Sequence, residues 1–315
     1  MYGNEHEVLA QALRWRQEGH RTVLATVLST YGASPRPPGS LAVISERGLI
    51  SGSVSGGCVE DDLVHEVMAG HFWRPDAERV ALRTYGRDAA ERERYRLPCG
   101  HALRLAIEPF WQTPPVETAL QAMAARRLVL RRLDYATGEV QITQGAADAP
   151  FQDDAQGLCQ VLGPRHRLLL IGATEVSRYL VPIATTLGYA VTVCDPRQEY
   201  TGAWPPDLPC DLWTAMPDDA VQQFACDERT AVITVTHDPK QDDLALIEAL
   251  QSRAFYVGAL GSSANTERRK ARLRAFDVSE AQVAALHGPV GLPIGSRSPA
   301  EIAVSIAAEL VQVRR

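Results

Sequence analysis

The residues best suited to chemistry lie in the segment 51–60, SGSVSGGCVE, where glycines and serines lead to a single cysteine, Cys58. Ser55, Gly56 and Gly57 add little side-chain bulk, so backbone N–H groups here can approach a ligand closely. Apolar residues then recur at helical spacing, which predicts a helix that starts at the cysteine. A thiol there can be a nucleophile, a ligand for a soft metal, or a small packed side chain.

Opposing charges surround this thiol. A helix N-terminus favours the thiolate, whereas Glu60, Asp61 and Asp62 in the first predicted turn disfavour it. Neither effect clearly dominates, so Cys58 need not be a strongly activated nucleophile. A soft metal or an incoming sulfur species would favour the thiolate in either case.

Two further segments of the first half carry groups that could bind a ligand. Arg36 lies in SPRPPGS, where prolines stiffen the chain, and a guanidinium fixed beside a glycine-rich loop suits phosphate or carboxylate. Cys99 lies in PCGH, directly before a predicted strand. Cys58, Cys99 and His101 lack the close-spaced pairs of a structural zinc site, so we do not predict zinc.

A glycine-containing turn opens the second half. Gly172 follows a buried apolar strand, and Asp195 closes the next strand, where a dinucleotide fold places its ribose-binding acid. Thr174 and Ser177 replace the second and third glycines of that motif, and Glu175 adds negative charge where a phosphate would lie. Two interpretations stay open: a nucleotide or pterin-phosphate site, and a Rossmann-like fold whose site has drifted.

Other polar residues should share the same sheet edge. His237 and Gly261 follow the third and fourth apolar strands, and ligands of such sheets bind outside the carboxyl ends of the strands. Arg297 lies just before a predicted helix that Ser298 and Glu301 begin as a capping box. Its guanidinium could bind a phosphate or lie free in solvent.

The spacing of apolar residues predicts an α/β protein with two domains. The first, residues 1–160, mixes helices and strands, and the second, residues 161–315, alternates strands with helices as in a Rossmann-like, doubly wound parallel sheet. In the first domain we expect an opening helix, strands at 21–30, 40–45, 78–85 and 103–110, a helix at 115–126, a hairpin with its turn at Thr137-Gly138, and a loop at 145–157.

Composition narrows the class of protein. A net charge of −6 argues against a general nucleic-acid binder, and no apolar run is long enough to cross a membrane. The six cysteines are scattered without CxxC spacing, which favours a reducing, cytoplasmic setting over a disulfide framework. A homodimer is expected because closed dimers are the commonest oligomers.

In these motifs the chain resembles the XdhC/CoxI family, the accessory factors of xanthine dehydrogenase and related molybdenum hydroxylases. The resemblance rests on SPRPPGS, GSVSGGCVE and PCG in the first half, and on DPR, THDPKQDDLAL, YVGALGS and GLPIGSRSPAEIA in the second. Members of the family usually show GAG where this chain has Gly172-Ala173-Thr174, and often follow PCG with a glycine where His101 stands here.

The resemblance implies a chaperone for the molybdenum cofactor, as molybdopterin or its cytidine dinucleotide form. Such a protein holds the cofactor while a cysteine desulfurase partner supports its sulfuration, and then delivers it to the molybdenum hydroxylase apo-enzyme. We therefore expect a maturation factor without a reaction of its own, with Cys58 facing the metal. The predicted cofactor-binding residues are Arg36, Ser55, Gly56, Gly57, Cys58, Glu60, Cys99, Gly172, Asp195, His237, Gly261 and Arg297.

Three alternatives belong to other classes. The first is an NAD(P)-dependent oxidoreductase with Asp195 on the ribose and His237 as the acid/base, although Thr174 and Glu175 count against it. The second is a nucleotidyltransferase, for which no early glycine-rich motif with metal-binding acids is visible. The third is a scaffold that only docks partners, with Cys58 buried and inert.

Overall fold

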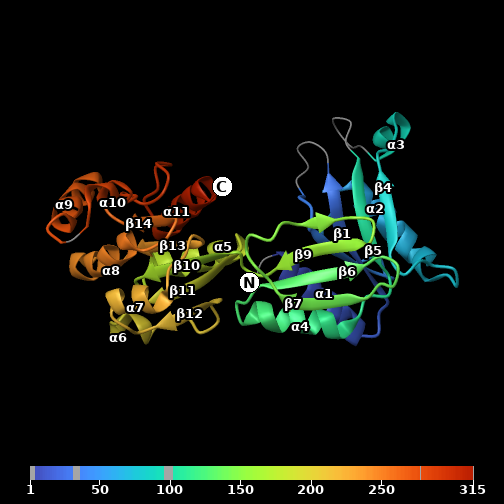
Figure 1. Ribbon diagram of the computed structural model, residues 1–315, viewed down its shortest axis with the longest axis horizontal. Helices are drawn as coiled ribbons and strands as arrows, with labels where there is room; N and C mark the ends of the chain where they lie inside the picture. The colour runs from blue at the N-terminus through green and yellow to red at the C-terminus, as the bar shows by residue number, and fades with distance from the viewer. Residues whose placement is uncertain (1–3, 31–35, 96–101, 277, 315) are drawn as a thin grey trace. The chain divides into compact units, whose positions relative to one another are not determined.

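The computed structural model describes residues 4–30, 36–95, 102–276 and 278–314. It divides into two compact units, of which the first ends at Gly163 and the second begins at Pro164 (Figure 1). Helices and strands mix in the first unit and alternate in the second, so the α/β fold class predicted from the sequence is confirmed.

An antiparallel sheet forms the centre of the first unit. Its strands lie in the order β3-β2-β1-β5-β4, and each strand that the sequence predicted here is present. These strands are rich in Val, Ile, Leu and Thr, residues that pack well on a pleated surface. The bounds are β1 Thr22–Thr30, β2 Leu41–Ser45, β3 Ile50–Gly52, β4 Ala81–Tyr85 and β5 Leu103–Glu108.

Helices cover both faces of this sheet. Val59, Leu63 and Val67 of α2 pack on one face, and Val8 and Trp15 of α1 belong to the core on the other. The helices of this unit are α1 Asn4–Gln17, α2 Cys58–Met68, the 3-10 turn η1 His71–Trp73, α3 Ala89–Arg94 and α4 Thr113–Ala124.

A second, four-stranded sheet in the order β7-β6-β9-β8 completes the first unit. The predicted hairpin around Thr137-Gly138 is confirmed, while the expected loop at 145–157 contains a short strand. Arg131 of this sheet donates to Glu108 of the first sheet at 2.5 Å, and both side chains are buried. The bounds are β6 Val129–Asp134, β7 Val140–Gln144, β8 Gln152–Asp153 and β9 Gly157–Leu162.

The second unit is built on a parallel sheet with the order β12-β11-β10-β13-β14. Counted along the chain, this is the 3-2-1-4-5 arrangement of a Rossmann fold, so the order reverses between β10 and β13. The short edge strand β12 was not among the expected strands. The bounds are β10 His166–Ile171, β11 Tyr189–Cys194, β12 Cys210–Trp213, β13 Thr230–Thr234 and β14 Tyr256–Ala259.

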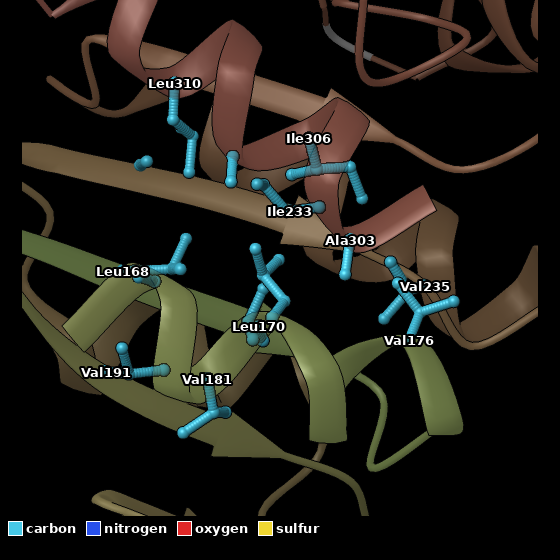
Figure 2. Close-up of a cluster of buried hydrophobic side chains, with 14 of the residues drawn as sticks. Leu168, Leu170, Val176, Val181, Val191, Ile233, Val235, Ala303, Ile306 and Leu310 are labelled. Atoms are coloured by element: carbon cyan, nitrogen blue, oxygen red, sulfur yellow. The ribbon is translucent and has the colours of Figure 1, made fainter. Parts of the chain in front are cut away.

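Helices flank the parallel sheet on both faces. Figure 2 shows Leu168, Leu170 and Ile233 of the sheet packed against Val181 of α5 and Ile306 of α11. Alternate residues of the same strands face α7 and α8 on the other side, which explains why these strands read as continuous apolar runs. The bounds are α5 Glu175–Thr186, α6 Gln198–Thr201, α7 Pro217–Phe224, α8 Pro239–Gln251, α9 Ser263–Leu273, α10 Glu280–Ala284 and α11 Pro299–Val313.

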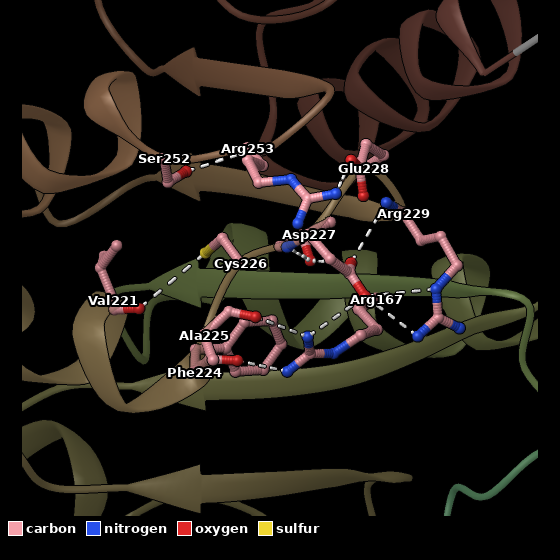
Figure 3. Close-up of polar contacts among 12 residues, drawn as sticks. Arg167, Val221, Phe224, Ala225, Cys226, Asp227, Glu228, Arg229, Ser252 and Arg253 are labelled. Carbon is pink, nitrogen blue, oxygen red and sulfur yellow. Dashed lines mark hydrogen bonds and ion pairs between the residues drawn. The ribbon is translucent and has the colours of Figure 1, made fainter.

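Polar contacts tie the amino ends of two central strands together (Figure 3). Arg167 donates to the carbonyl oxygens of Phe224 and Ala225, and lies 3.7 Å from Asp227. Asp227 also pairs with Arg229 at 3.0 Å. These contacts join the start of β10 to the segment that leads into β13.

No helix in the described part of the chain is long and apolar enough to span a bilayer.

The fold generates a prediction at Gly52, the last residue of β3. Its φ is +82°, and a Cβ there would lie 2.3 Å from the Leu41 carbonyl oxygen and 2.5 Å from a Val8 methyl group. We expect Gly52→Ala to lower the free energy of unfolding by at least about 2 kcal/mol in urea titrations. Gly19→Ala is the control, because Gly19 has a similar φ of +85° and open space around its Cβ position. Equal losses in the two variants would contradict the role of the close contact.

Candidate functional site

Several strands of the antiparallel sheet begin or end at the same end of the sheet, the end at which β1 finishes. Thr30 at the end of β1 and Tyr85 at the end of β4 both pair with Leu103, the first residue of β5. Gly52 at the end of β3 pairs with Ala42 near the start of β2, in the same row as Ala25 of β1. β3 therefore runs in the same direction as β1 and ends level with a residue five positions before Thr30. The Arg36 segment and the segment around Cys99 therefore adjoin the same end of the sheet, and β3 runs toward that end before the loop 53–57 begins.

The described residues next to two of these segments are well anchored. Arg36 is half-buried, and the turn that follows it is fixed because Gly39 N–H donates to the Val27 carbonyl oxygen at 2.8 Å. Cys99 lies outside the described residues. Tyr95, which precedes it in the sequence, places its hydroxyl 3.5 Å from an oxygen of Asp62 on α2.

The loop 53–57 wraps around the carboxylate of Glu60. Oε1 accepts hydrogen bonds from the Ser53 hydroxyl at 2.7 Å and from the backbone N–H groups of Val54, Ser55 and Gly56 at 2.9, 2.8 and 2.9 Å. Oε2 accepts from the Ser55 hydroxyl and from the Gly57 N–H at 2.9 Å. The sequence predicted that the N–H groups of this loop approach a ligand. In the structure they donate to the carboxylate of Glu60.

These hydrogen bonds decide the charge of Glu60, whose side chain is 9% exposed. Burial raises the pKa of this carboxyl group, but the hydrogen bonds from Ser55, Gly56 and Ser53 outweigh it and lower the pKa to about 2. Glu60 is therefore ionised at neutral pH, and the loop holds a permanent negative charge.

Cys58 is the first residue of α2, as the sequence predicted, and Gly57 is the N-cap residue before it. The side chain of Cys58 is not among those described. A Cβ at Gly57 would meet nothing within 4 Å, so packing does not explain the glycine there. Its absence of a side chain leaves room for a ligand directly before the cysteine.

Two of the other cysteines serve packing. Burial, followed by the charge of Asp195, raises the pKa of the Cys194 thiol to about 12, and burial also raises the pKa of the Cys226 thiol. The sulfur of Cys226 points to the Val221 carbonyl oxygen (Figure 3). A raised pKa leaves less of the thiolate at neutral pH, and the thiolate is the form that attacks or binds metals. Among the side chains that the structure describes, no group of His, Cys, Asp and Glu could hold a metal ion.

In the second unit, four predicted residues follow the carboxyl ends of the strands. Gly172 comes after β10, Asp195 after β11, His237 after β13 and Gly261 after β14. Gly172 has a φ of +119°, and a Cβ there would lie 3.0 Å from the Thr236 backbone nitrogen. His237 is exposed and has a φ of +62°, which is uncommon for a residue with a side chain.

Arg297 stands apart from this set, in the loop before α11. Its backbone N–H donates to Glu301 Oε2 at 2.8 Å, and its side chain is exposed. Ser298 and Glu301 form the predicted capping box, which is confirmed. The guanidinium is therefore presented to solvent by a rigid helix start.

Asp195 is fully buried, and its own chain supplies partners for both oxygens. Oδ1 accepts from the Arg197 N–H and Nε at 3.1 and 2.9 Å, and Oδ2 accepts from Arg197 Nη2 at 2.7 Å and from the Ala173 N–H at 2.9 Å. Burial raises the pKa of this carboxyl group, but these hydrogen bonds outweigh it and lower the pKa below its usual value.

These contacts do not fit a nicotinamide dinucleotide of the usual kind. The ribose of NAD needs an accessible acid at the end of the second strand, and here Arg197 covers Asp195. Thr174 also occupies the position where a glycine lets the backbone approach the pyrophosphate. The turn after β10 instead lies close to Thr236, which follows β13. This close approach requires a glycine at position 172.

Two residues that contact Glu60 and Asp195 were not among the site residues predicted from the sequence. Ser53 contributes a hydroxyl to Glu60, and Arg197 neutralises Asp195. An arginine two residues after a strand-ending aspartate is a signal that could have indicated the second pair. No sequence spacing indicated that the N–H groups of residues 54–57 turn toward Glu60.

Comparison with known families decides the assignment. A model described as the XdhC Rossmann domain matches residues 168–310, and one described as the XdhC and CoxI family matches residues 15–85. Together the two matches cover more than half of the chain. The chain belongs to the XdhC and CoxI family. The resemblance inferred from its motifs is thereby confirmed.

Two relatives match nearly the whole XdhC chain. A protein of Bacillus subtilis (strain 168), named as a probable xanthine dehydrogenase subunit, is 26% identical over 338 residues, covering 99% of this chain and 98% of its own. A protein of Escherichia coli (strain K12) named molybdenum cofactor insertion chaperone PaoD is 26% identical over 311 residues, covering 98% of this chain and 88% of its own.

A solved structure shares the fold of the XdhC chain. The crystal structure, described as a xanthine dehydrogenase from Bacillus halodurans, has a TM-score of 0.75 and a sequence identity of 22%. The match covers 100% of this chain and 97% of that chain. It supports the antiparallel and parallel sheets described above.

The Glu60 loop predicts a pH dependence for the stability of this XdhC protein. A carboxyl group whose pKa falls from 4.5 to about 2 on folding stabilises the folded state above pH 4.5, by about 3 kcal/mol. This contribution is lost as the pH falls from 4.5 toward 2. Urea unfolding should therefore show a gap between wild type and Glu60→Gln that is wide at pH 6 and narrows at pH 3. A constant gap would contradict the hydrogen-bonded carboxylate.

The Asp195–Arg197 pair predicts weak or absent binding of NADH. A ligand at about 100 times its dissociation constant adds about 2.7 kcal/mol to stability, which a thermal melt detects easily. We expect the melting temperature of the XdhC protein to be unchanged by NADH. A clear, saturable increase would show that the ribose can reach Asp195.

Proposed function

We propose that this chain is a maturation factor that binds the molybdenum cofactor and inserts it into a molybdenum hydroxylase of the xanthine dehydrogenase type. The observation that carries the proposal is the direction of the strands: β1, β3 and β4 all run toward the end of the sheet that adjoins the Arg36 segment and the segment around Cys99. Tyr95, which precedes the Cys99 segment, also lies 3.5 Å from Asp62 on the helix that Cys58 begins. Membership of the XdhC and CoxI family supports it. The name of the PaoD relative supports the cofactor in particular.

The chemistry of these segments suits the two ends of such a cofactor. A thiolate at Cys58 suits a soft metal or a sulfur ligand, and open space at Gly57 lets a bulky group come close to it. Arg36 suits an anionic tail, whether in molybdopterin or in its cytidine dinucleotide form. Because the N–H groups of the loop already donate to Glu60, the anionic tail of the cofactor needs a cationic side chain as its binding partner.

We also propose the partners and setting of this function. The cofactor is held while a cysteine desulfurase supplies sulfur for its terminal ligand, and is then delivered to the apo-hydroxylase in the cytoplasm. The working unit is a homodimer. In this role the protein binds and releases cargo without catalysing a reaction of its own.

The competing oxidoreductase gains no support from the second unit. Its nicotinamide cofactor would need Asp195 for the ribose, and Arg197 covers that carboxylate.

The test is retention of molybdenum by purified protein. Wild type and Cys58→Ser are mixed anaerobically with molybdenum cofactor, and molybdenum that elutes with the protein is measured. We expect about one molybdenum per wild-type chain and a loss of at least about tenfold in Cys58→Ser, because a hydroxyl is a poor ligand for a soft metal.

Cys159→Ser is the matched control. Cys159 is a free, half-buried cysteine of the same unit and lies in β9 of the four-stranded sheet. This variant should retain molybdenum as wild type does. Equal retention by Cys58→Ser, or unchanged activation of the hydroxylase by it, would overturn the assignment of Cys58.

A further inference from the structure

The start of α2 is held by an unusual arrangement. Five consecutive residues, 53–57, all donate to one carboxylate, that of Glu60, which lies in the first turn of the same helix. In most helix starts a side chain before the helix accepts from its first N–H groups. Glu60 accepts from the N-cap Gly57 N–H as in a capping box, and it also accepts from the residues before Gly57, so that the whole preceding loop is bound.

Apart from Glu60, the described contacts that anchor the loop lie at its first two residues. Val54 is fully buried in the core, and the Ser53 N–H donates to the Leu41 carbonyl oxygen at 3.3 Å. Gly56 and Gly57 are exposed, and glycine has more accessible backbone conformations than other residues. Gly56 adopts a φ of +102°. For residues 54–57, the described hydrogen bonds of the N–H groups go to Glu60, apart from a long one from Gly57 to the Ser55 hydroxyl at 3.4 Å.

We propose that Glu60 is a positioning residue, which locks residues 53–57 in one conformation and so fixes the backbone of Cys58. The proposal rests on the function proposed for Cys58. It changes the role expected for Glu60 itself: the carboxylate organises the binding loop from within and does not contact the cofactor.

The charge of Glu60 is part of this role. A carboxylate can accept at two oxygens and needs no proton of its own, so it matches a ring of donors. Glutamine has the same shape, but its amide nitrogen is a donor. In Glu60→Gln one end of the side chain therefore faces the loop donors with the wrong polarity.

Hydrogen exchange of the loop amides tests the lock without any cofactor. We expect a peptide covering residues 54–57 to exchange at least about tenfold faster in Glu60→Gln than in wild type, because the N–H groups lose a charged acceptor. Asp61→Asn is the matched control. It removes the same charge from the next residue, which is exposed, and should leave the exchange unchanged.

Molybdenum retention then tests the consequence for the site. Glu60→Gln should retain at least about tenfold less molybdenum cofactor than wild type although Cys58 is intact, while Asp61→Asn retains it fully. Wild-type exchange rates in Glu60→Gln would overturn the proposal. So would fast exchange combined with full retention, because the loop conformation would then not matter for binding.

A milder variant covers the case in which Glu60→Gln fails to fold. Ser55→Ala removes one side-chain donor and keeps the carboxylate, so a smaller rise in exchange with an intact fold is expected. No rise in Ser55→Ala would overturn the proposal in that case. The proposed function fails by a different result, which is molybdenum retention by Cys58→Ser with unchanged exchange in the loop.

Discussion

Burying a carboxylate is costly unless hydrogen bonds replace the water that it loses, and this constraint organises the first unit of the protein. Glu60 meets it by drawing the backbone of residues 53–57 around itself. We infer that the conformation of the loop and the placement of the Cys58 backbone depend on that one group. The antiparallel sheet supplies the strand, β3, from which the loop departs.

The second unit also contains a buried carboxylate whose partners come from its own chain. Asp195 is buried at the carboxyl edge of the parallel sheet, where related folds keep an acid ready for a ribose. Here Arg197 and the Ala173 N–H satisfy it, so the acid stabilises the turn between β10 and α5. A fold often used for dinucleotides is thus retained while the charge that would bind the ribose is neutralised within the chain.

Much of the architecture could be predicted from the sequence, because apolar periodicity reports burial directly. The strands around the core, the hairpin at Thr137-Gly138 and the helix beginning at Cys58 follow from it. β12 escaped notice because an edge strand is short and half-exposed, and β8 because its residues are polar. The role of Glu60 could not be predicted, since its charge is visible in the sequence but the direction of the N–H groups is set only by the folded loop.

The hairpin between β2 and β3 has a practical consequence. Arg47 is exposed in its turn, at the end of the strands opposite to Gly52 and the loop beyond it. β2 separates the two ends by about 16 Å, from the rise of an extended strand. A label introduced at position 47 by chemistry that spares thiols would therefore lie far from Gly52 and leave Cys58 unmodified.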